Sequence, residues 1–517
     1  MYIKETNQIW VAKSHRPIYL TSKMANRHGL IAGATGTGKT VTSKVLAEAF
    51  SDMGIPVFMA DIKGDVSGLG VQGEMNDNIQ KRVDKLGVEG LQMTSYPVRF
   101  FDVYGRKGIP VRATISEMGP DLLARLLDLN DVQTGVLSIV FRVADDRGML
   151  LLDLKDLRAM VQYVGENATE YTTRYGNIAA QSIGAIQRTL LRLEDQGGNE
   201  FFGEPALNVM DWFLTDQRGR GYINILHCVE LFQSPLLYST FMLWMLAEIY
   251  ENLPESGDVD KPKMVFFFDE AHLLFADAPK ALLQKIDQVV KLIRSKGVGI
   301  YFITQVPNDI PDNVLSQLGN KVQHALRAFT PNEQKALRGA ADSFRSNPDF
   351  DTLAALTELG TGEALVSFLG EDGVPEMVER AMVLPPQSMI GAMDDPTRVY
   401  MLQQDVLQAK YKDVLDRESA YEMLTVAVAS QEEASAESGQ EKPMTREEIE
   451  AQIEERARQM AEEMAASKGS REKETKAKPK TYSSKSTVER TIDSAMTTVG
   501  REISRQLIRG ILGSLKR

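Results

Sequence analysis

The amino-acid sequence predicts an α/β fold built on a mostly parallel sheet. Three segments support this prediction, because each is a short apolar run that ends in glycine or polar residues, as strands buried on both faces do. They are residues 29–32 before the glycine-rich stretch 33–40, residues 264–268 before Asp269-Glu270, and residues 299–303 before Thr304-Gln305. Parallel α/β sheets bind ligands at the carboxyl ends of their strands, so these ends are expected to form one site.

The stretch 33–40 fits the pattern GxxxxGK[ST] at every fixed position. Its residues are Gly33, Ala34, Thr35, Gly36, Thr37, Gly38, Lys39 and Thr40. An apolar run precedes it and a helix-like segment follows from Val41, which is the context of a phosphate site rather than of a glycine-rich turn that binds nothing. Glycines let backbone N–H groups approach phosphates, and a helix start favours anions. We expect residues 33–41 to bind ATP, with Lys39 on the β- and γ-phosphates and Thr40 on Mg²⁺.

The run at residues 264–268 ends in two adjacent carboxylates. Asp269 is expected to bind Mg²⁺ directly or through water, as the acidic residue of a Walker B strand does. Glu270 is placed to orient and activate the attacking water. An exposed acidic strand end is the alternative, and Lys39 upstream argues against it. At the third strand end, Gln305 can contact the γ-phosphate and report its loss. Together these residues predict Mg²⁺-dependent ATP hydrolysis.

The letters Asp269-Glu270-Ala271-His272 also match the DEAH box of one class of RNA helicases. The spacing argues against that class, because Lys39 and Asp269 lie much farther apart than in such helicase cores. No Gln-Arg-x-Gly-Arg-x-Gly-Arg stretch follows to supply the arginines of that class. His272 is therefore expected to pack or cap rather than to catalyse.

Composition narrows the class of protein further. The chain has 517 residues, 43% of them apolar, which suffices for a large core with additions. Its single cysteine, Cys228, excludes an intrachain disulfide framework and indicates a reducing, cytoplasmic location. The first residues lack the apolar core of a signal peptide, and the longest apolar stretch, residues 236–247, is too short to span a bilayer. The net charge of −12 weighs against a DNA-coating protein, although a ring can confine positive charge to its channel.

Periodicity and composition divide the chain into segments. These are a lead-in at residues 1–28, the first part of the ATPase core at 29–115, a helical insertion at 116–204, the second part of the core at 205–390, a helical extension at 391–430, a charged linker at 431–486 and a basic amphipathic helix at 487–517. Leucines at helical spacing predict the insertion, and Glu-, Lys- and Ser-rich composition predicts that the linker is disordered. The last helix carries Arg501, Arg505 and Arg509 beside an apolar stripe. It can dock on its own ring, bind an acidic protein or lie on a membrane surface.

These segments together resemble the HerA/FtsK superfamily of ring-forming ATPases, and in particular the bacterial HerA-like proteins of the YjgR type. The matching stretches are residues 29–40, 61–65, 265–272 and 295–305. The resemblance implies a RecA-like P-loop NTPase core in a homo-oligomer, a hexamer, that hydrolyses ATP at subunit interfaces and translocates along duplex DNA. It also implies an arginine that a neighbouring subunit inserts into each site. Arg294, before the strand that ends at Thr304, and Arg327, in a strand expected over residues 322–329, are the candidates, and either could instead form a surface salt bridge.

Two functions are compatible with these features. One is a DNA translocase or helicase driven by ATP hydrolysis, which the resemblance across the whole core favours. The other is an ATP-switched assembly or a membrane-associated scaffold that does not move on nucleic acid. The acidic net charge favours this second function. So does the short segment before the glycine loop, which implies that the β-barrel of the archaeal HerA proteins is absent.

Overall fold

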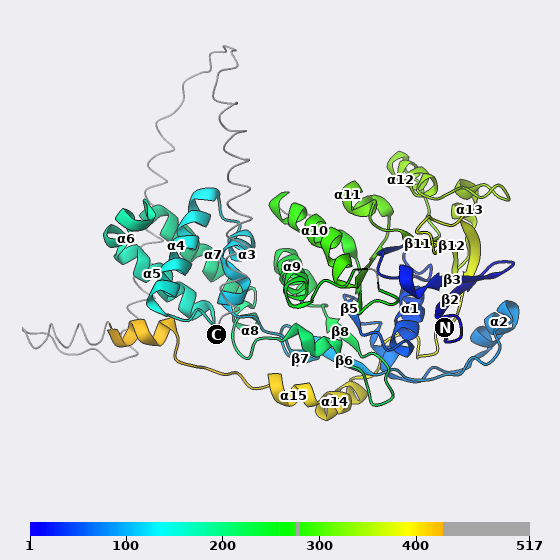
Figure 1. Cartoon of the computed structure of the whole chain (residues 1–517), viewed down its shortest axis with the longest axis horizontal. Helices are drawn as coiled ribbons and strands as arrows, with labels where there is room; N and C mark the ends of the chain where they lie inside the picture. The colour runs from blue at the N-terminus through cyan, green and yellow to red at the C-terminus, as the bar shows by residue number, and fades with distance from the viewer. Residues whose placement is uncertain (258, 276–279, 428–517) are drawn as a thin grey trace, which may run out of the picture. The chain divides into compact units, whose positions relative to one another are not determined.

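The computed structural model describes residues 1–257, 259–275 and 280–427, which all belong to one unit, Met1–Met444. Within them a 13-stranded sheet has the strand order β1-β2-β13-β12-β11-β4-β10-β9-β5-β8-β6-β7, with β3 paired to β2 (Figure 1). The linker and the amphipathic helix expected at residues 431–486 and 487–517 lie outside the described residues.

The strands follow from the apolar runs of the sequence. Their bounds are β1 Tyr2–Ile3, β2 Gln8–Lys13, β3 Pro17–Thr21, β4 Gly29–Ala32, β5 Val57–Asp61, β6 Val98–Asp102, β7 Ile109–Pro110, β8 Ile223–His227, β9 Met264–Phe268, β10 Val298–Thr304, β11 Asn320–His324, β12 Glu363–Ser367 and β13 Glu379–Val383. Neighbours from β11 to β7 in the strand order pair in parallel, and β12, β13, β2, β1 and β3 extend the sheet by antiparallel pairing. The predicted mostly parallel α/β fold is confirmed.

Helices connect these strands and cover the sheet. Their bounds are α1 Lys39–Asp52, α2 Asp77–Leu86, α3 Ile115–Leu126, α4 Asp131–Arg147, α5 Leu154–Glu166, α6 Ala168–Tyr175, α7 Ala180–Asp195, α8 Gly198–Phe201, α9 Pro235–Asn252, α10 Lys280–Ile293, α11 Asp312–Leu315, α12 Pro331–Asp342, α13 Thr352–Glu358, α14 Asp395–Gln404 and α15 Val406–Tyr411. Helices α3 to α8 lie between β7 and β8, so the fold contains the expected helical insertion. They form one group whose α3 packs against α9 (Figure 1).

Strand β9 shows why the parallel part of the sheet is apolar throughout. Alternate side chains of a strand point to opposite faces. Phe266 and Phe268 join the apolar core that contains α9 and α10, whereas Val265 and Phe267 join the core that contains α1. Every residue of β9 is buried. Burying one such Phe or Val side chain contributes about 1.5–3 kcal/mol to folding. Helices on both faces therefore hold the carboxyl end of β9 in a fixed position.

Helix α9 corresponds to the longest apolar stretch of the sequence. A helix that is apolar on all sides is buried on all sides, and side chains from Leu237 to Leu246 are almost inaccessible. The helix packs against α3 of the insertion and against α10. Of the helices in the described ranges, none is both long and apolar enough to cross a membrane. The interpretation of this stretch as a core helix agrees with the structure.

The strand expected over residues 322–329 is shorter than predicted, because β11 ends at His324. Its neighbour β4 ends at Ala32, where the glycine loop begins. The last residue pair between β11 and its other neighbour, β12, is His324 with Ala364. Beyond that point the carbonyl of Ala325 accepts a hydrogen bond from the glycine loop instead of from a strand. Arg327 therefore lies past the strand, in the segment that leads to α12, and not within the sheet.

Candidate active site

The glycine loop leaves the sheet between two strand ends that hold it. Strand β4 lies between β10 and β11 and is parallel to both, so all three carboxyl ends meet at one edge. The Gly33 amide donates to the carbonyls of Thr304 (3.3 Å) and Gln305 (3.2 Å) at the end of β10. The Ala34 amide donates to the carbonyl of Ala325 just after β11, at 2.9 Å. The beginning of the loop is therefore fixed from both sides.

His324 lies directly beneath this loop and explains why glycine is required there. Gly33 has φ of +151°, and a Cβ atom added to it would lie 2.6 Å from the Cβ of His324. Burial lowers the pKa of His324 to about 4, so the ring is neutral. Nδ1–H donates to the Glu363 carbonyl at 3.0 Å, which leaves Nε2 to accept from the Thr42 hydroxyl of α1 at 2.8 Å. This uncharged side chain connects β11, the loop and α1.

The tip of the loop presents donors without acceptors. Thr35 and Gly36 are exposed, and the amides of Thr35, Gly36 and Gly38 donate to no described residue. Helix α1 begins at Lys39, and the amides of a first helical turn, here up to Val41, have no acceptor within their helix. Within the described part of the chain, Lys39 Nζ donates only to carbonyls of its own loop, those of Gly33 (2.5 Å) and Ala34 (3.2 Å). These donors lack an anion, so the loop fits the phosphates of a nucleotide.

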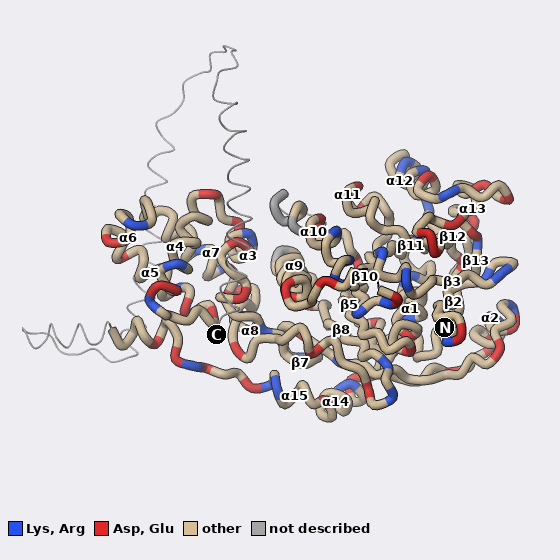
Figure 2. The backbone as a smooth tube through the Cα atoms, in the orientation of Figure 1, with Lys and Arg blue, Asp and Glu red and all other residues tan. Residues whose placement is uncertain are grey.

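The carboxylate pair lies at the same edge, at the end of β9. Strand β5 is the parallel neighbour of β9, and the turn that follows β5 carries Lys63. Lys63 Nζ lies 2.7 Å from Glu270 Oε1 and 3.6 Å from Asp269 Oδ2. Glu270 has a left-handed backbone, with φ of 44° and ψ of 50°, which is uncommon for a residue other than glycine and occurs often at functional sites. Figure 2 shows both signs of charge close together around α1, β5 and β10.

The pKa shifts show how strongly these groups interact. Burial alone would raise the pKa of Glu270, but the hydrogen bond and charge of Lys63 outweigh burial and lower it. Burial raises the pKa of Asp269, and the charge of Lys63 opposes that shift. Burial also lowers the pKa of Lys39, with the charge of Lys63 as the second cause, while Glu270 and Asp269 act in the opposite sense. The two lysines and the two carboxylates therefore form one electrostatic cluster.

The oxygen atoms near Thr40 fit a magnesium ion. Thr40 Oγ1 donates to Asp65 Oδ2 at 3.2 Å, and Asp65 Oδ1 and Asp61 Oδ2 are buried without a hydrogen-bond partner among the described residues. Burial, followed by the charge of Asp65, raises the pKa of Asp61 to about 7. Mg²⁺ prefers oxygen ligands and is commonly held by one or two carboxylates together with substrate phosphates. In agreement, no cluster of three or more His, Cys, Asp or Glu side chains in the described ranges could hold a metal alone.

Of the two candidate arginines, only Arg327 lies at the phosphate edge. It follows the carboxyl end of β11, is exposed, and forms no ion pair with any described residue. Arg294 belongs to the 3₁₀ turn that precedes β10. Burial lowers the pKa of His28, which precedes β4, to about 4, and the charge of Arg294 adds to this shift. Both of those residues therefore lie where the parallel strands begin, at the opposite edge. Gln305 is exposed at the phosphate edge, as the sequence predicts.

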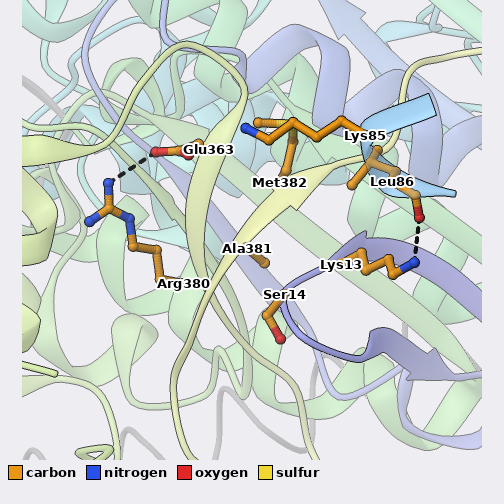
Figure 3. A pocket seen from close by; sticks show the side chains of 8 residues that line it. All are labelled: Lys13, Ser14, Lys85, Leu86, Glu363, Arg380, Ala381 and Met382. Atoms are coloured by element: carbon orange, nitrogen blue, oxygen red, sulfur yellow. Dashed lines mark hydrogen bonds and ion pairs between the residues drawn. The ribbon is translucent and has the colours of Figure 1, made fainter. Parts of the chain in front are cut away.

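A cavity of about 230 Å³ lies elsewhere, and Figure 3 shows the residues that line it. These are Lys13, Ser14, Lys85, Leu86, Glu363, Arg380, Ala381 and Met382. It contains none of the residues predicted for ATP or Mg²⁺. Two of its cations are already bound by protein groups, because Lys13 donates to the Leu86 carbonyl and Arg380 pairs with Glu363 at 3.2 Å. The loop and the strand ends, rather than this cavity, form the candidate active site.

Lys63, Asp65 and His324 belong to the site, although the sequence assigned them no role. Each lies at or just after the carboxyl end of a parallel strand, β5 for the first two and β11 for the third. The stretch 61–65 resembles the superfamily, which is a signal for Lys63 and Asp65. Their place in the site depends on the strand order, because only the neighbouring strands determine which side chains lie next to a strand end.

Comparison with known proteins identifies the family of the chain. The model of the helicase HerA-like C-terminal family matches residues 6–517. The DNA double-strand break repair helicase HerA of Sulfurisphaera tokodaii is 22% identical over 352 residues, which are 66% of this chain and 62% of that protein. A probable helicase of Methanocaldococcus jannaschii is 22% identical over 352 residues, 67% of this chain and 60% of that protein. The chain thus spans less than two thirds of the length of these relatives.

Solved structures show the same fold. The bacterial conjugative coupling protein TrwBdeltaN70 has a TM-score of 0.50 and 14% identity, and the match covers 73% of this chain and 89% of that one. TrwB in complex with the non-hydrolysable GTP analogue GDPNP also has a TM-score of 0.50, with 12% identity over 73% of this chain and 90% of that one. At these identities the likeness concerns the α/β core alone. Since the family model spans nearly the whole sequence, the chain belongs to the helicase HerA-like C-terminal family.

Proposed function

We propose that this protein is a Mg²⁺-dependent ATPase that works as a homo-oligomeric ring, a hexamer, and moves along duplex DNA. One observation carries the proposal. The glycine loop carries Lys39 and the amides of Thr35, Gly36 and Gly38, which have no acceptor among the described residues, and it lies at the same sheet edge as Asp269 and Glu270. This arrangement joins phosphate binding to a general base.

The single cysteine, Cys228, is buried and supports a cytoplasmic location.

In this proposal the residues of the site divide the reaction between them. The loop amides and Lys39 hold the phosphates, and Thr40 and Asp269 would hold Mg²⁺, which would neutralise negative charge on the phosphate oxygens. Glu270 accepts a proton from the attacking water. The water oxygen forms a bond to the γ-phosphorus while the bond from that phosphorus to the β,γ-bridging oxygen breaks, which releases phosphate and ADP. Gln305 lies where it can contact the γ-phosphate.

Arg327 is the better candidate for an arginine supplied to a neighbouring subunit. It is exposed, is free of ion pairs within the described part of the chain, and lies at the edge where the phosphates would bind. Phe329, two residues later, is 82% exposed, as expected for a side chain that a neighbouring subunit covers. An arginine suits this role because its planar guanidinium group stabilises charge on the transferred phosphoryl group.

A mixing experiment tests whether sites are shared between subunits. An Arg327→Ala protein should bind ATP normally but fail to hydrolyse it. Adding Lys39→Ala subunits should restore part of the activity, because some interfaces then combine an intact Lys39 with an intact Arg327 from the neighbour. Arg294→Ala, at the opposite edge, serves as the matched arginine control and should stay active. Absence of recovery at every mixing ratio, or full activity in a protein shown to be monomeric, would contradict the shared site.

The proposed substrate, duplex DNA, is supported by family membership and by the name of one relative, the DNA double-strand break repair helicase HerA of Sulfurisphaera tokodaii. The decisive measurement is the ATPase rate of the purified protein without nucleic acid and with duplex DNA, single-stranded DNA or RNA. We expect duplex DNA to stimulate hydrolysis at least severalfold, and the stimulation to weaken as salt rises, because phosphate contacts are screened. Hydrolysis that no nucleic acid alters would instead favour the ATP-switched assembly or scaffold.

A further inference from the structure

Lys63 forms the strongest charged contact of the site, and none of the roles above uses it. Its Nζ lies 2.7 Å from Glu270 Oε1 and 3.6 Å from Asp269 Oδ2. The two carboxylate side chains are only 10% and 15% exposed. Two adjacent carboxylates that are removed from water repel each other and need a nearby cation. Lys63 is that cation as long as no metal ion is bound.

The contact is incompatible with the roles that Asp269 and Glu270 have in hydrolysis. Glu270 Oε1 is held by the Lys63 ammonium group at 2.7 Å, so this oxygen is not available to accept a proton from an attacking water. The other oxygen of Glu270 lies 3.4 Å from His272 Nδ1 and makes no hydrogen bond with a described residue. A divalent cation at Asp269 would also meet the positive charge of Lys63. Lys63 must therefore leave before the site can work.

The structure allows the Lys63 side chain to leave while its backbone stays. The turn after β5 is fixed by a hydrogen bond from the Gly64 amide to Asp61 Oδ1 at 2.7 Å, and Gly64 has a positive φ of 78°. Asp65 in the same turn accepts from Thr40. The Lys63 side chain is nevertheless 36% exposed, on a flexible four-carbon stem. It can swing towards solvent without unfolding the turn.

We propose that Lys63 is a positioning residue that stands in for the divalent cation in the nucleotide-free protein, holding Asp269 and Glu270 together and releasing both when metal and nucleotide bind. This inference rests on the proposed function, because it assigns Asp269 to the metal and Glu270 to the water. Lys63 thereby keeps metal ions from occupying the acidic pair before ATP arrives, and it keeps Glu270 inactive until then.

The test measures Mn²⁺ binding to the nucleotide-free full-length protein, with the free ion followed by electron paramagnetic resonance. Lys63→Met should bind Mn²⁺ at least tenfold more tightly than the wild type, because the carboxylate pair has lost its internal cation. Lys63→Arg keeps the charge and should bind Mn²⁺ as the wild type does. Adding Asp269→Asn to Lys63→Met should abolish the gain in affinity.

Lys410→Met is the matched control. Lys410 Nζ pairs with Asp211 Oδ2 at the same distance of 2.7 Å, but Asp211 lies in a 3₁₀ turn that belongs to none of the strand ends of the site. Removing this lysine should leave Mn²⁺ affinity unchanged. An equal gain in Lys410→Met would show that any lost surface charge has the same effect, which would overturn the proposal.

Binding of a fluorescent ATP analogue in the presence of EDTA completes the test. Lys63→Met should bind the analogue within about twofold of the wild type, and this also shows that the variant is folded. Unchanged Mn²⁺ affinity, or a tenfold loss of analogue binding, would overturn the proposal, since the second result would make Lys63 a phosphate ligand. Neither measurement requires hydrolysis, so a protein without ATPase activity would refute the proposed function and still give an answer about Lys63.

Discussion

Replacing Glu270 by glutamine is expected to leave ATP binding intact and to slow hydrolysis by about a hundredfold or more. Glutamine has nearly the same shape as glutamate but cannot accept a proton from the attacking water. The phosphate donors at residues 33–41 do not depend on this side chain, because they are backbone amides and Lys39, whose hydrogen bonds go to the loop itself. The measurement is the single-turnover rate of ATP hydrolysis alongside the dissociation constant of a fluorescent ATP analogue.

Glu194→Gln is a suitable control for this prediction. Glu194 is a partly buried carboxylate in α7, paired with Arg158 at 3.0 Å, and it lies in the helical insertion rather than at the phosphate edge. This variant should hydrolyse ATP at the wild-type rate. If Glu270→Gln also kept the wild-type rate, another residue would have to position the water and Glu270 would not be the general base.

Lys39→Ala is expected to abolish turnover and to weaken ATP binding at least tenfold. A hydrogen bond to a charged group is worth about 1.5–3 kcal/mol, and 1.4 kcal/mol already corresponds to a factor of ten. Among the described residues, the Lys39 ammonium group makes no ion pair with a carboxylate and donates hydrogen bonds to two carbonyls of its own loop. It can therefore turn to phosphate without breaking an ion pair. Isothermal titration calorimetry with a non-hydrolysable ATP analogue measures the loss.

Lys81→Ala provides the comparison for this second prediction, because Lys81 is an exposed lysine on α2 and belongs to none of the strand ends of the site. It should leave both binding and turnover unchanged. Equal affinity of Lys39→Ala and the wild type for the analogue would show that the amides alone hold the phosphates and that Lys39 has no binding role.

Local patterns in the sequence predicted the strands and the loop, because apolar runs and a fixed glycine spacing are properties of consecutive residues. Strands β4, β9 and β10 therefore appear close to where they were expected. The partners of the carboxylate pair could not be predicted in the same way. Lys63 meets Glu270 only because β5 lies beside β9, and the strand order does not follow the order along the chain.

The two arginines show a related limit. A helix before a strand and a segment after a strand lie at opposite edges of a parallel sheet, so Arg294 and Arg327 are separated by the length of the strands between them. The sequence does not show that the two arginines lie at opposite edges, because the strand expected over residues 322–329 places Arg327 within the sheet. The strand ends at His324 because its residues no longer pair with β4 and β12 beyond that point. Where it ends therefore depends on where the neighbouring strands end, and not on the apolar character of the segment itself.

Strand β11 has a consequence for the proposed ring. His324 at its end contacts the glycine loop and α1, the next residue accepts a hydrogen bond from the loop, and Arg327 follows two residues later. The same short segment thus touches its own nucleotide loop and carries the arginine proposed for the neighbouring site. A shift of the loop when nucleotide binds or leaves would move that arginine. In the proposed ring, the occupancy of one subunit would set the readiness of the next, and the subunits would hydrolyse ATP in succession rather than independently.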